Sequence, residues 1–222
     1  MKKQLVVIAT VICSSIPISA LGVNTGDAKL GQAHYIFCQT CHGVNAEGNQ
    51  PTGAPRLVGL QGWYLVKQLI KFRAGLRGNE PQDTFGQQMA SIAKTLPNEQ
   101  AIHDVVAYIM TLEVDSLPRT DKTVSPVEST HVFWHCTHCH GSKGQGINEG
   151  YTRNPSALHP PAPKLAGQHD WYLLRQIQNF KSRIRASQSG DKEGTQCRVR
   201  GMPNLSSDED IKNVVDYIQT LQ

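Results

Sequence analysis

Two cysteines separated by two residues and followed directly by a histidine occur twice in the sequence, at residues 38–42 (CQTCH) and 136–140 (CTHCH). This spacing places two thiols beside the edge of a porphyrin, where they can add to its two vinyl groups, while the adjacent imidazole reaches the iron. The sequence therefore predicts two covalently bound haem c groups. The expected thioether-forming residues are Cys38, Cys41, Cys136 and Cys139, and the expected iron ligands within the motifs are His42 and His140.

Two other kinds of site also use paired cysteines. A structural zinc site would need a second pair of ligands at a suitable distance in each half of the chain, and a thioredoxin-like redox site would need a βαβ setting. The sequence offers neither, and both copies carry the histidine directly after the second cysteine. Haem attachment is the interpretation that the residues favour.

The two motifs belong to a longer internal repeat. The segment around Trp63 matches the segment around Trp171, and the apolar pattern of residues 96–112 matches that of residues 205–221. The second copy is longer before its tryptophan, because it carries an insertion within a Gly- and Pro-rich stretch, residues 144–161. One domain has been duplicated, and 222 residues suit two domains of ~100 residues each.

The elements that must position these residues are helices. Apolar residues recur at i, i+3, i+4 and i+7 in the last segment of each copy, which is the spacing of an amphipathic helix. Asn98 begins the first of these helices, and Ser206 with Glu209 three residues later predicts a capping box for the second. Strand signals are nearly absent. We expect an all-α fold of two tandem domains. Each has a short helix before the cysteine pair, a middle helix around the tryptophan and a terminal helix, joined by loops.

Residues 1–20 have the layout of a secretory signal peptide. Lys2 and Lys3 precede an apolar stretch, residues 5–18, which is followed by Ser19 and Ala20. The stretch is too short and too interrupted for a membrane anchor, which needs ~20 apolar residues. We expect cleavage near Ala20 and export to the periplasm.

The repeat also sets the expected domain boundaries. A polar segment that contains prolines separates the two copies, as a linker does. The expected order is a signal peptide at residues 1–20, a first haem domain at 21–115, a linker at 116–126 and a second haem domain at 127–222. No later apolar segment approaches the length of a membrane span, so we expect none in the mature chain.

Composition argues against other classes of protein. The chain has 22 Lys and Arg against 18 Asp and Glu, a net charge of +4, and no tract dense in basic residues. Binding to nucleic acid therefore has little support. Cys13 lies in the signal peptide, so the mature chain keeps five of the six cysteines, and an odd number argues against a closed set of disulfides.

These motifs resemble those of the di-haem class I c-type cytochromes of bacteria, and most of all the cytochrome c4 family, over nearly the whole chain after the signal peptide. The resemblance implies two class I cytochrome c domains, each a few helices wrapped around a haem. It implies that Pro55 and Pro163 offer their backbone carbonyls to the iron-binding histidines. It also implies that Gly31 and Tyr35 meet the terminal helix near Tyr108.

The sixth iron ligand shapes the redox character of each haem, because a Met thioether favours Fe(II) whereas an anionic thiolate favours Fe(III). In the first copy Met89 lies in an expected loop, seven residues before Leu96, where cytochromes of this type place their ligand. Met110 falls within the terminal helix pattern and is expected in the core. Met89 is therefore the predicted ligand.

The second copy offers two sulfur donors. Met202 is its only methionine and stands in a Met-Pro sequence, a common ligand context in class I cytochromes. The repeat register instead sets Cys197 opposite Met89, since both follow the tryptophan of their copy at the same distance along the sequence. We predict Met202 as the ligand and keep Cys197 as the alternative.

With both irons six-coordinate, no position is open for substrate, and the expected chemistry is electron transfer through an exposed haem edge. We expect an electron-transfer protein without catalytic residues, which carries electrons from a membrane respiratory complex or a dehydrogenase to a terminal oxidase or reductase. Two alternatives stay open. The protein could oxidise a small sulfur compound such as thiosulfate at a His/Cys-ligated haem, or it could be the electron-accepting subunit of a larger dehydrogenase or oxidase complex.

Overall fold

The computed structural model describes residues 25–113, 126–148 and 161–221, and the secondary structure of these residues is helical. The first half contains α1 (Ala28–His42), α2 (Gly62–Arg73), α3 (Thr84–Ala93) and α4 (Glu99–Ile109). The second half contains α5 (Pro126–His140), α6 (Asp170–Lys181), α7 (Lys192–Arg200), the 3₁₀ helix η2 (Met202–Asn204) and α8 (Asp208–Thr220). In these ranges only isolated bridges occur and no strand. The all-α prediction is confirmed.

Parts of the expected domain plan lie outside the described residues. These are the signal peptide at residues 1–20 and residues 116–125 of the expected linker. The last residue of that linker, Pro126, is the first residue of α5. Among the helices of the described ranges, none combines the length and the apolar character needed to cross a bilayer.

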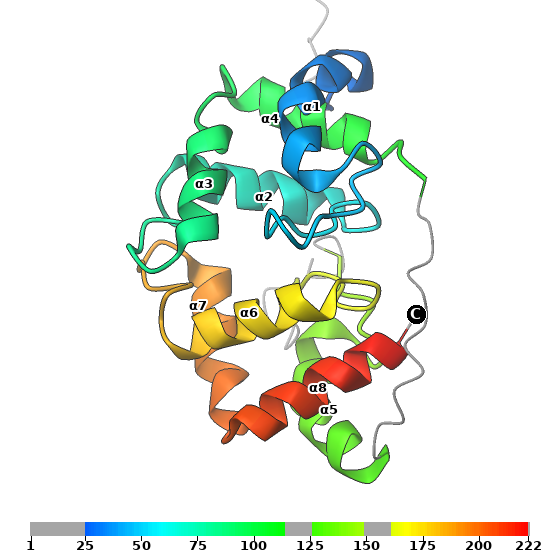
Figure 1. Cartoon of the computed structure of the whole chain (residues 1–222), viewed down its shortest axis with the longest axis vertical. Coiled ribbons are helices and arrows are strands. Elements are labelled where there is room, and N and C mark those ends of the chain that lie inside the picture. The colour runs from blue at the N-terminus through cyan, green and yellow to red at the C-terminus, as the bar shows by residue number, and fades with distance from the viewer. Residues whose placement is uncertain (1–24, 114–125, 149–160, 222) are drawn as a thin grey trace, which may run out of the picture.

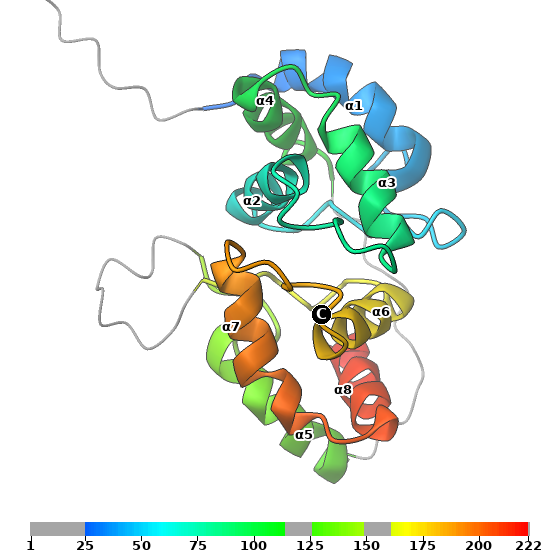
Figure 2. The ribbon, with the colours of Figure 1, turned by 90° about the vertical axis from the view of Figure 1, so that its left-hand side faces the viewer.

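The two halves are stacked along the long axis of the molecule, with α1 to α4 at one end and α5 to α8 at the other (Figure 1). The middle helices α2 and α6 lie at the boundary between the halves (Figures 1 and 2). Side chains bond across this boundary. Arg77 Nη2 donates to Tyr172 Oη and Arg185 Nη2 donates to Tyr64 Oη, each at 3.1 Å. Each half therefore presents its middle helix to the other.

The first and last helices of the first half cross closely. A Cβ atom placed on Gly31 would lie 1.8 Å from the backbone oxygen of Asp104, so only glycine lets the two backbones approach this far. The rings of Tyr35 and Tyr108 pack together with centroids 5.3 Å apart. The contact that the resemblance implied between α1 and α4 is present.

The terminal helices α4 and α8 line the apolar cores of their halves. Their buried apolar residues recur at the spacing that the sequence predicted: Ile102, Val105, Val106 and Ile109 in α4, and Ile211, Val214, Val215 and Ile218 in α8. Phe133 and Tyr217 repeat the ring contact of the first half, with centroids 5.1 Å apart. The prediction of two amphipathic terminal helices is confirmed.

Side-chain caps mark the starts of both terminal helices. Asn98 caps α4 as expected, since its side chain accepts a hydrogen bond from the backbone N–H three residues later at 2.9 Å. The capping box of α8 is formed by Ser207 and Asp210, so the expected pair, Ser206 and Glu209, is wrong by one residue. Ser207 has the extended backbone that an N-cap needs, with φ −125° and ψ 167°, and the helix begins directly after it.

Two helices occupy segments where loops were expected. Met89 lies on α3 and Cys197 lies on α7, so the expected loop around Met89 is corrected to a helix. Each helix follows an aspartate, Asp83 or Asp191, whose carboxylate accepts a hydrogen bond from the backbone N–H three residues later at 3.0 Å. The sequence of α7, KEGTQCRVR, has no apolar residues at helical spacing from which the helix could be predicted, and none of its residues is fully buried.

The close crossing of α1 and α4 predicts a large effect of adding a side chain at Gly31. Gly31→Val is expected to lower the free energy of unfolding of the haem-loaded protein by about 1–3 kcal/mol through overpacking, measured by denaturant titration. Ala33→Val adds the same side chain at an exposed position of α1 and should cost less than about 1 kcal/mol. Equal losses in the two variants would contradict the close approach.

Candidate haem sites

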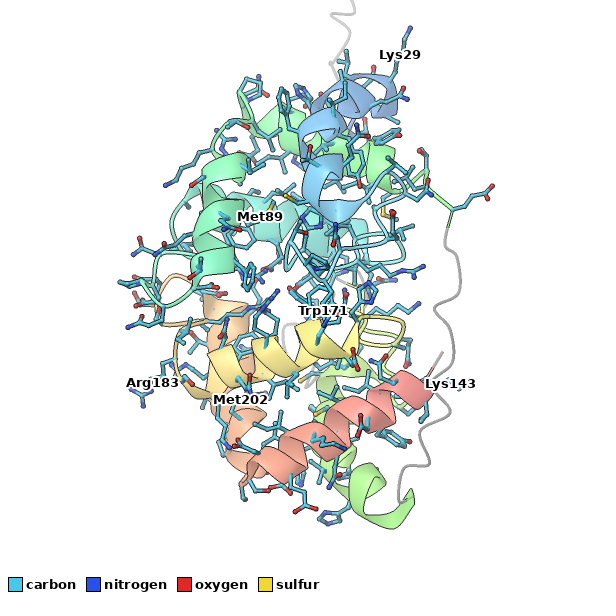
Figure 3. The ribbon with its side chains drawn as sticks, in the orientation of Figure 1. Lys29, Met89, Lys143, Trp171, Arg183 and Met202 are labelled. Carbon is cyan, nitrogen blue, oxygen red and sulfur yellow. The ribbon has the colours of Figure 1, made fainter. Side chains whose placement is uncertain are left out.

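One cavity in each half gathers the candidate site residues. The first is lined by Cys38, Cys41, His42, Pro55 and Met89. The second is lined by Cys136, Cys139, His140, Pro163, Cys197 and Met202. The structure thus brings together the cysteines, the histidine, the proline and the candidate sixth ligands of each half. Figure 3 shows Met89 at α3 in the first half and Met202 in the second.

The cysteine pairs and histidines lie at the ends of α1 and α5, which both end at the histidine of the motif. A glycine follows each histidine, with φ 85° at Gly43 and 79° at Gly141. Residues with a side chain rarely adopt such a positive φ, and the helix cannot continue through it. The chain therefore turns away directly after each imidazole.

A proline carbonyl orients each imidazole. His42 Nδ1 lies 2.8 Å from the oxygen of Pro55, and His140 Nδ1 lies 2.7 Å from the oxygen of Pro163. Because a carbonyl oxygen only accepts, Nδ1 carries the proton and the lone pair of Nε2 is left for a metal. Burial lowers the pKa of both histidines below the ordinary value, against the opposing effect of these hydrogen bonds. Both rings are neutral near pH 7 and suited to bind iron.

The five cysteines of the described residues are thiols without a disulfide between them. Burial, together with neighbouring cysteines, raises the pKa of Cys38 to about 11 and that of Cys136 to about 12. The motif cysteines are therefore available for thioether bonds.

The candidate sixth ligands lie on matching elements. Met89 and Cys197 each lie six residues after the capping aspartate of their helix. Met202 lies on η2 and packs against the apolar core of the second half. Burial raises the pKa of Cys197 to about 11, and Arg185 opposes this rise. Met110, expected in the core, is 54% exposed because it lies just beyond the last turn of α4, so that expectation is wrong.

The middle helix of the other half completes each cavity. From α6, the first cavity receives Tyr172, Arg175 and Gln176. From α2, the second cavity receives Trp63, Tyr64, Lys67, Gln68 and Lys71. The residues that line both cavities include Tyr64, Gln68, Tyr172 and Gln176. The two cavities therefore share a wall.

Two arginines are buried at this shared wall. Arg77 and Arg185 are each 9% exposed. Each donates to a glutamine of its own half at 2.7 Å and to a tyrosine hydroxyl of the other half at 3.1 Å. Among the described residues, no carboxylate forms an ion pair with either of them. Our reading of the sequence missed this pair, although the two arginines occupy matching positions of the repeat, in register with Trp63 and Trp171.

These features fit a haem in each cavity. A buried guanidinium without an anionic partner is costly in a protein interior, and the two propionate carboxylates of a haem are anions of the kind that the wall lacks. Arg185 Nε also has no hydrogen-bond partner within the described part of the chain. Large apolar side chains suited to a porphyrin face line both cavities, including Leu65 and Phe72 in the first and Leu173 and Phe180 in the second.

An ion cluster ties α2 of the first half to the start of α7. Lys71 Nζ lies 2.6 Å from Asp191 Oδ1 and 2.8 Å from Glu193 Oε2. Partial burial raises the pKa of Glu193, but the hydrogen bonds from Lys71 and Lys67 and the charge of Lys71, together with a backbone hydrogen bond, outweigh it and hold this pKa at about 2. The position that matches Glu193 in the first half is Phe85, whose ring centroid lies 4.2 Å from the guanidinium carbon of Arg175. Both contacts connect the two halves, one as an ion pair and the other as a cation over an aromatic ring.

The low pKa of Glu193 predicts acid-sensitive stability. The ion pair stabilises the fold fully above the unfolded pKa of ~4.3, and this contribution is lost as the pH falls toward the folded pKa of about 2. Between about pH 5 and pH 2 the wild type should therefore lose more free energy of unfolding than Glu193→Gln, measured by denaturant titration. The difference should be roughly 1 kcal/mol or less, since the carboxylate is partly exposed. Parallel curves for the two proteins would contradict the pairing with Lys71.

Known proteins are similar to this chain in sequence. The family model described as cytochrome c matches residues 28–113 and 129–222. Cytochrome c4 of Azotobacter vinelandii is 27% identical over 219 residues, which cover 93% of this chain and 95% of that protein. The thiosulfate dehydrogenase electron acceptor of Stutzerimonas stutzeri (strain A1501) is 30% identical over 195 residues, which cover 82% of this chain and 77% of that protein.

A solved structure has a similar fold over both halves. The crystal structure of reduced recombinant cytochrome c4 from Pseudomonas stutzeri matches with a TM-score of 0.64 and 27% identity, over 89% of this chain and 100% of that chain. The two matches to the family model fall on the two halves that hold the two cavities. The chain therefore belongs to the cytochrome c family, as an electron-transfer protein of two class I domains that is similar to cytochrome c4 and carries two covalently bound haem c groups.

Proposed function

We propose that the protein is a periplasmic electron carrier, which accepts electrons from a membrane quinol-oxidising complex or a dehydrogenase and passes them to a terminal oxidase or reductase. The observation that carries this proposal is the wall shared by the two cavities. Two one-electron centres on either side of one layer of side chains can exchange electrons within the chain. The signal peptide expected at residues 1–20 supports the periplasmic location.

In the first half, Cys38 and Cys41 would hold the haem through thioether bonds, and His42 and Met89 would be its iron ligands. The hydrogen bond from His42 Nδ1 to the carbonyl of Pro55 keeps the ring in one orientation and makes it a stronger donor. The neutral thioether of Met89 favours Fe(II) and raises the potential.

In the second half, Cys136, Cys139 and His140 would play the corresponding parts. Met202 is the proposed sixth ligand, and Cys197 is the alternative. The two donors differ in charge, so the choice between them changes the potential of the second haem.

The bound haem supplies an iron that alternates between Fe(III) and Fe(II) and so carries one electron. The chain supplies the surroundings of that iron. Apolar side chains such as Leu65 and Leu173 exclude water from the cavities. Arg77 and Arg185 place positive charge at the shared wall, where it balances carboxylates and favours the reduced state.

A more specific donor is a thiosulfate dehydrogenase. The name of the Stutzerimonas stutzeri relative supports this candidate. In that case the protein acts as the electron-accepting partner or subunit of the dehydrogenase. A further alternative, in which the protein itself oxidises a small sulfur compound, rests on Cys197 as an iron ligand of the second haem.

The carrier proposal predicts reversible reduction by a partner protein. The haem-loaded protein should contain two haems per chain by the pyridine haemochrome assay. Stopped-flow absorbance should show rapid reduction by a quinol-oxidising membrane fraction or by purified thiosulfate dehydrogenase with thiosulfate, and reoxidation by a terminal oxidase. Thiosulfate added to the protein alone should reduce nothing. Reduction by thiosulfate without the dehydrogenase would instead support the enzymatic alternative, and failure with both donors would overturn the carrier proposal.

The buried charge at the shared wall predicts a shift of potential. Arg185→Met removes a buried cation while keeping similar bulk, so the midpoint potential of the second haem should fall by tens of millivolts, where ~59 mV is a tenfold change for one electron. Arg183→Met removes an exposed arginine two residues away and should leave both potentials near the wild-type values (Figure 3). Spectroelectrochemical titration of both variants makes the comparison. Equal shifts would show that the buried position of Arg185 has no special effect.

A further inference from the structure

The second cavity contains a pair of sulfur donors that the first cavity lacks. Cys197 on α7 and Met202 on η2 both line the cavity that His140 lines, and they are five residues apart in the sequence. Among the described residues that line the first cavity, Met89 is the one sulfur side chain besides the two cysteines of the haem motif. The two copies of the domain therefore differ in how many sixth-ligand candidates they hold.

Helix position favours Cys197. The helices α3 and α7 both begin after an aspartate whose carboxylate accepts a hydrogen bond from the backbone N–H three residues later at 3.0 Å. Met89 and Cys197 lie at the same distance along these helices, six residues after the aspartate. Cys197 therefore occupies the helix position at which the first half carries its predicted ligand.

One neighbour of Cys197, Arg185, favours an anion at this sulfur, against the effect of burial. Arg185 lines the same cavity, is 9% exposed and has an Nε atom without a hydrogen-bond partner within the described residues. A buried guanidinium stabilises a thiolate more than a neutral thioether. The carboxylate of Asp191 also lines the cavity and opposes an anion at Cys197, although it is paired with Lys71 at 2.6 Å.

Met202 is a neutral donor and does not favour Fe(III), and a glycine lies between it and Cys197 in the sequence. Its thioether is neutral and packs against the apolar core of the second half. Gly201 stands directly before it, where α7 ends, and donates its N–H to the oxygen of Cys197 at 2.8 Å. Glycine changes backbone conformation at low cost, so the segment between the two donors can adjust which of them faces the centre of the cavity.

We propose that the sixth ligand of the second haem changes with the oxidation state of its iron, from Cys197 in the ferric form to Met202 in the ferrous form. The proposal rests on the electron-transfer function proposed above, because it requires both states to be visited in each cycle. A thiolate stabilises Fe(III) and a thioether stabilises Fe(II), so each donor binds the state that it favours.

The exchange balances in atoms and electrons. One electron from the donor protein reduces the iron, the bond between iron and Cys197 Sγ breaks, and the bond between iron and Met202 Sδ forms. The released thiolate takes one proton from solvent. Reoxidation by the acceptor protein returns the electron, the proton and the two bonds to their starting arrangement. The second haem then has a lower midpoint potential with Cys197 bound than with Met202 bound.

The test compares ligand spectra of the two oxidation states of the haem-loaded wild-type protein. Electron paramagnetic resonance and near-infrared magnetic circular dichroism of the ferric protein should show one thioether-ligated haem and one thiolate-ligated haem. Resonance Raman spectra of the fully reduced protein should show two six-coordinate thioether-ligated haems. In cyclic voltammetry the oxidation and reduction peaks of the second haem should separate as the scan rate rises, because the ligand exchange lags behind the electron.

Three variants assign the signals. Cys197→Ser should lose the ferric thiolate signal and keep the reduced spectrum of the wild type. Met202→Leu should keep the ferric thiolate signal and, when reduced, show a five-coordinate haem that binds carbon monoxide. Met89→Leu is the matched control, since it should change the first haem in both states and leave both states of the second haem unchanged.

The outcomes separate this proposal from the proposed function. The same donor on the second haem in both oxidation states, whether thioether or thiolate, overturns the exchange, and so does a ferric thiolate signal that survives in Cys197→Ser. These results leave a two-haem carrier intact. Fewer than two haems per chain, or no electron transfer with either donor, overturns the proposed function instead. If a variant loses haem, the comparison of the two wild-type states still decides the question.

Discussion

The arrangement of the two halves depends on two positive charges buried where they meet. Arg77 and Arg185 each bond to a glutamine of their own half and to a tyrosine hydroxyl of the other. These partners are neutral and do not balance the charge, and an unbalanced guanidinium in a protein interior is costly. Haem carboxylates are anions of the kind that could balance this charge. The two arginines thus both line the candidate haem cavities and bond across the boundary between the halves.

The sequence predicts most of what depends on local pattern. Residues 38–42 and 136–140 carry the haem motif, the repeat indicates duplication, and the apolar spacing predicts the terminal helices that bury Ile102 and Ile211. It does not predict α7, because the sequence of this helix, KEGTQCRVR, has no apolar residues at helical spacing. Nor does it predict the wall between the cavities, where bonded residues lie far apart in the sequence and only the folded chain brings them together.

The second sixth ligand was ambiguous in the sequence for a physical reason. Local context favours Met202, whereas the register of the repeat favours Cys197, and both side chains line one cavity. The two halves also differ at a position four residues before Cys197. Glu193 forms a partly buried ion pair with Lys71, whereas Phe85, at the matching position, packs under Arg175. Duplication kept the scaffold and allowed the charges around each site to change separately.

The shared wall has a consequence for how such a protein can evolve. A domain that supplies all the residues of its own binding site keeps that site when it is copied or moved to another chain. Here α2 lines the cavity of the second half and α6 lines the cavity of the first, so either half on its own would have an incomplete site. A substitution at Tyr64 or Tyr172 acts on both sites at once. The two copies are therefore expected to evolve together at this wall, because a change in one copy alters the sites of both.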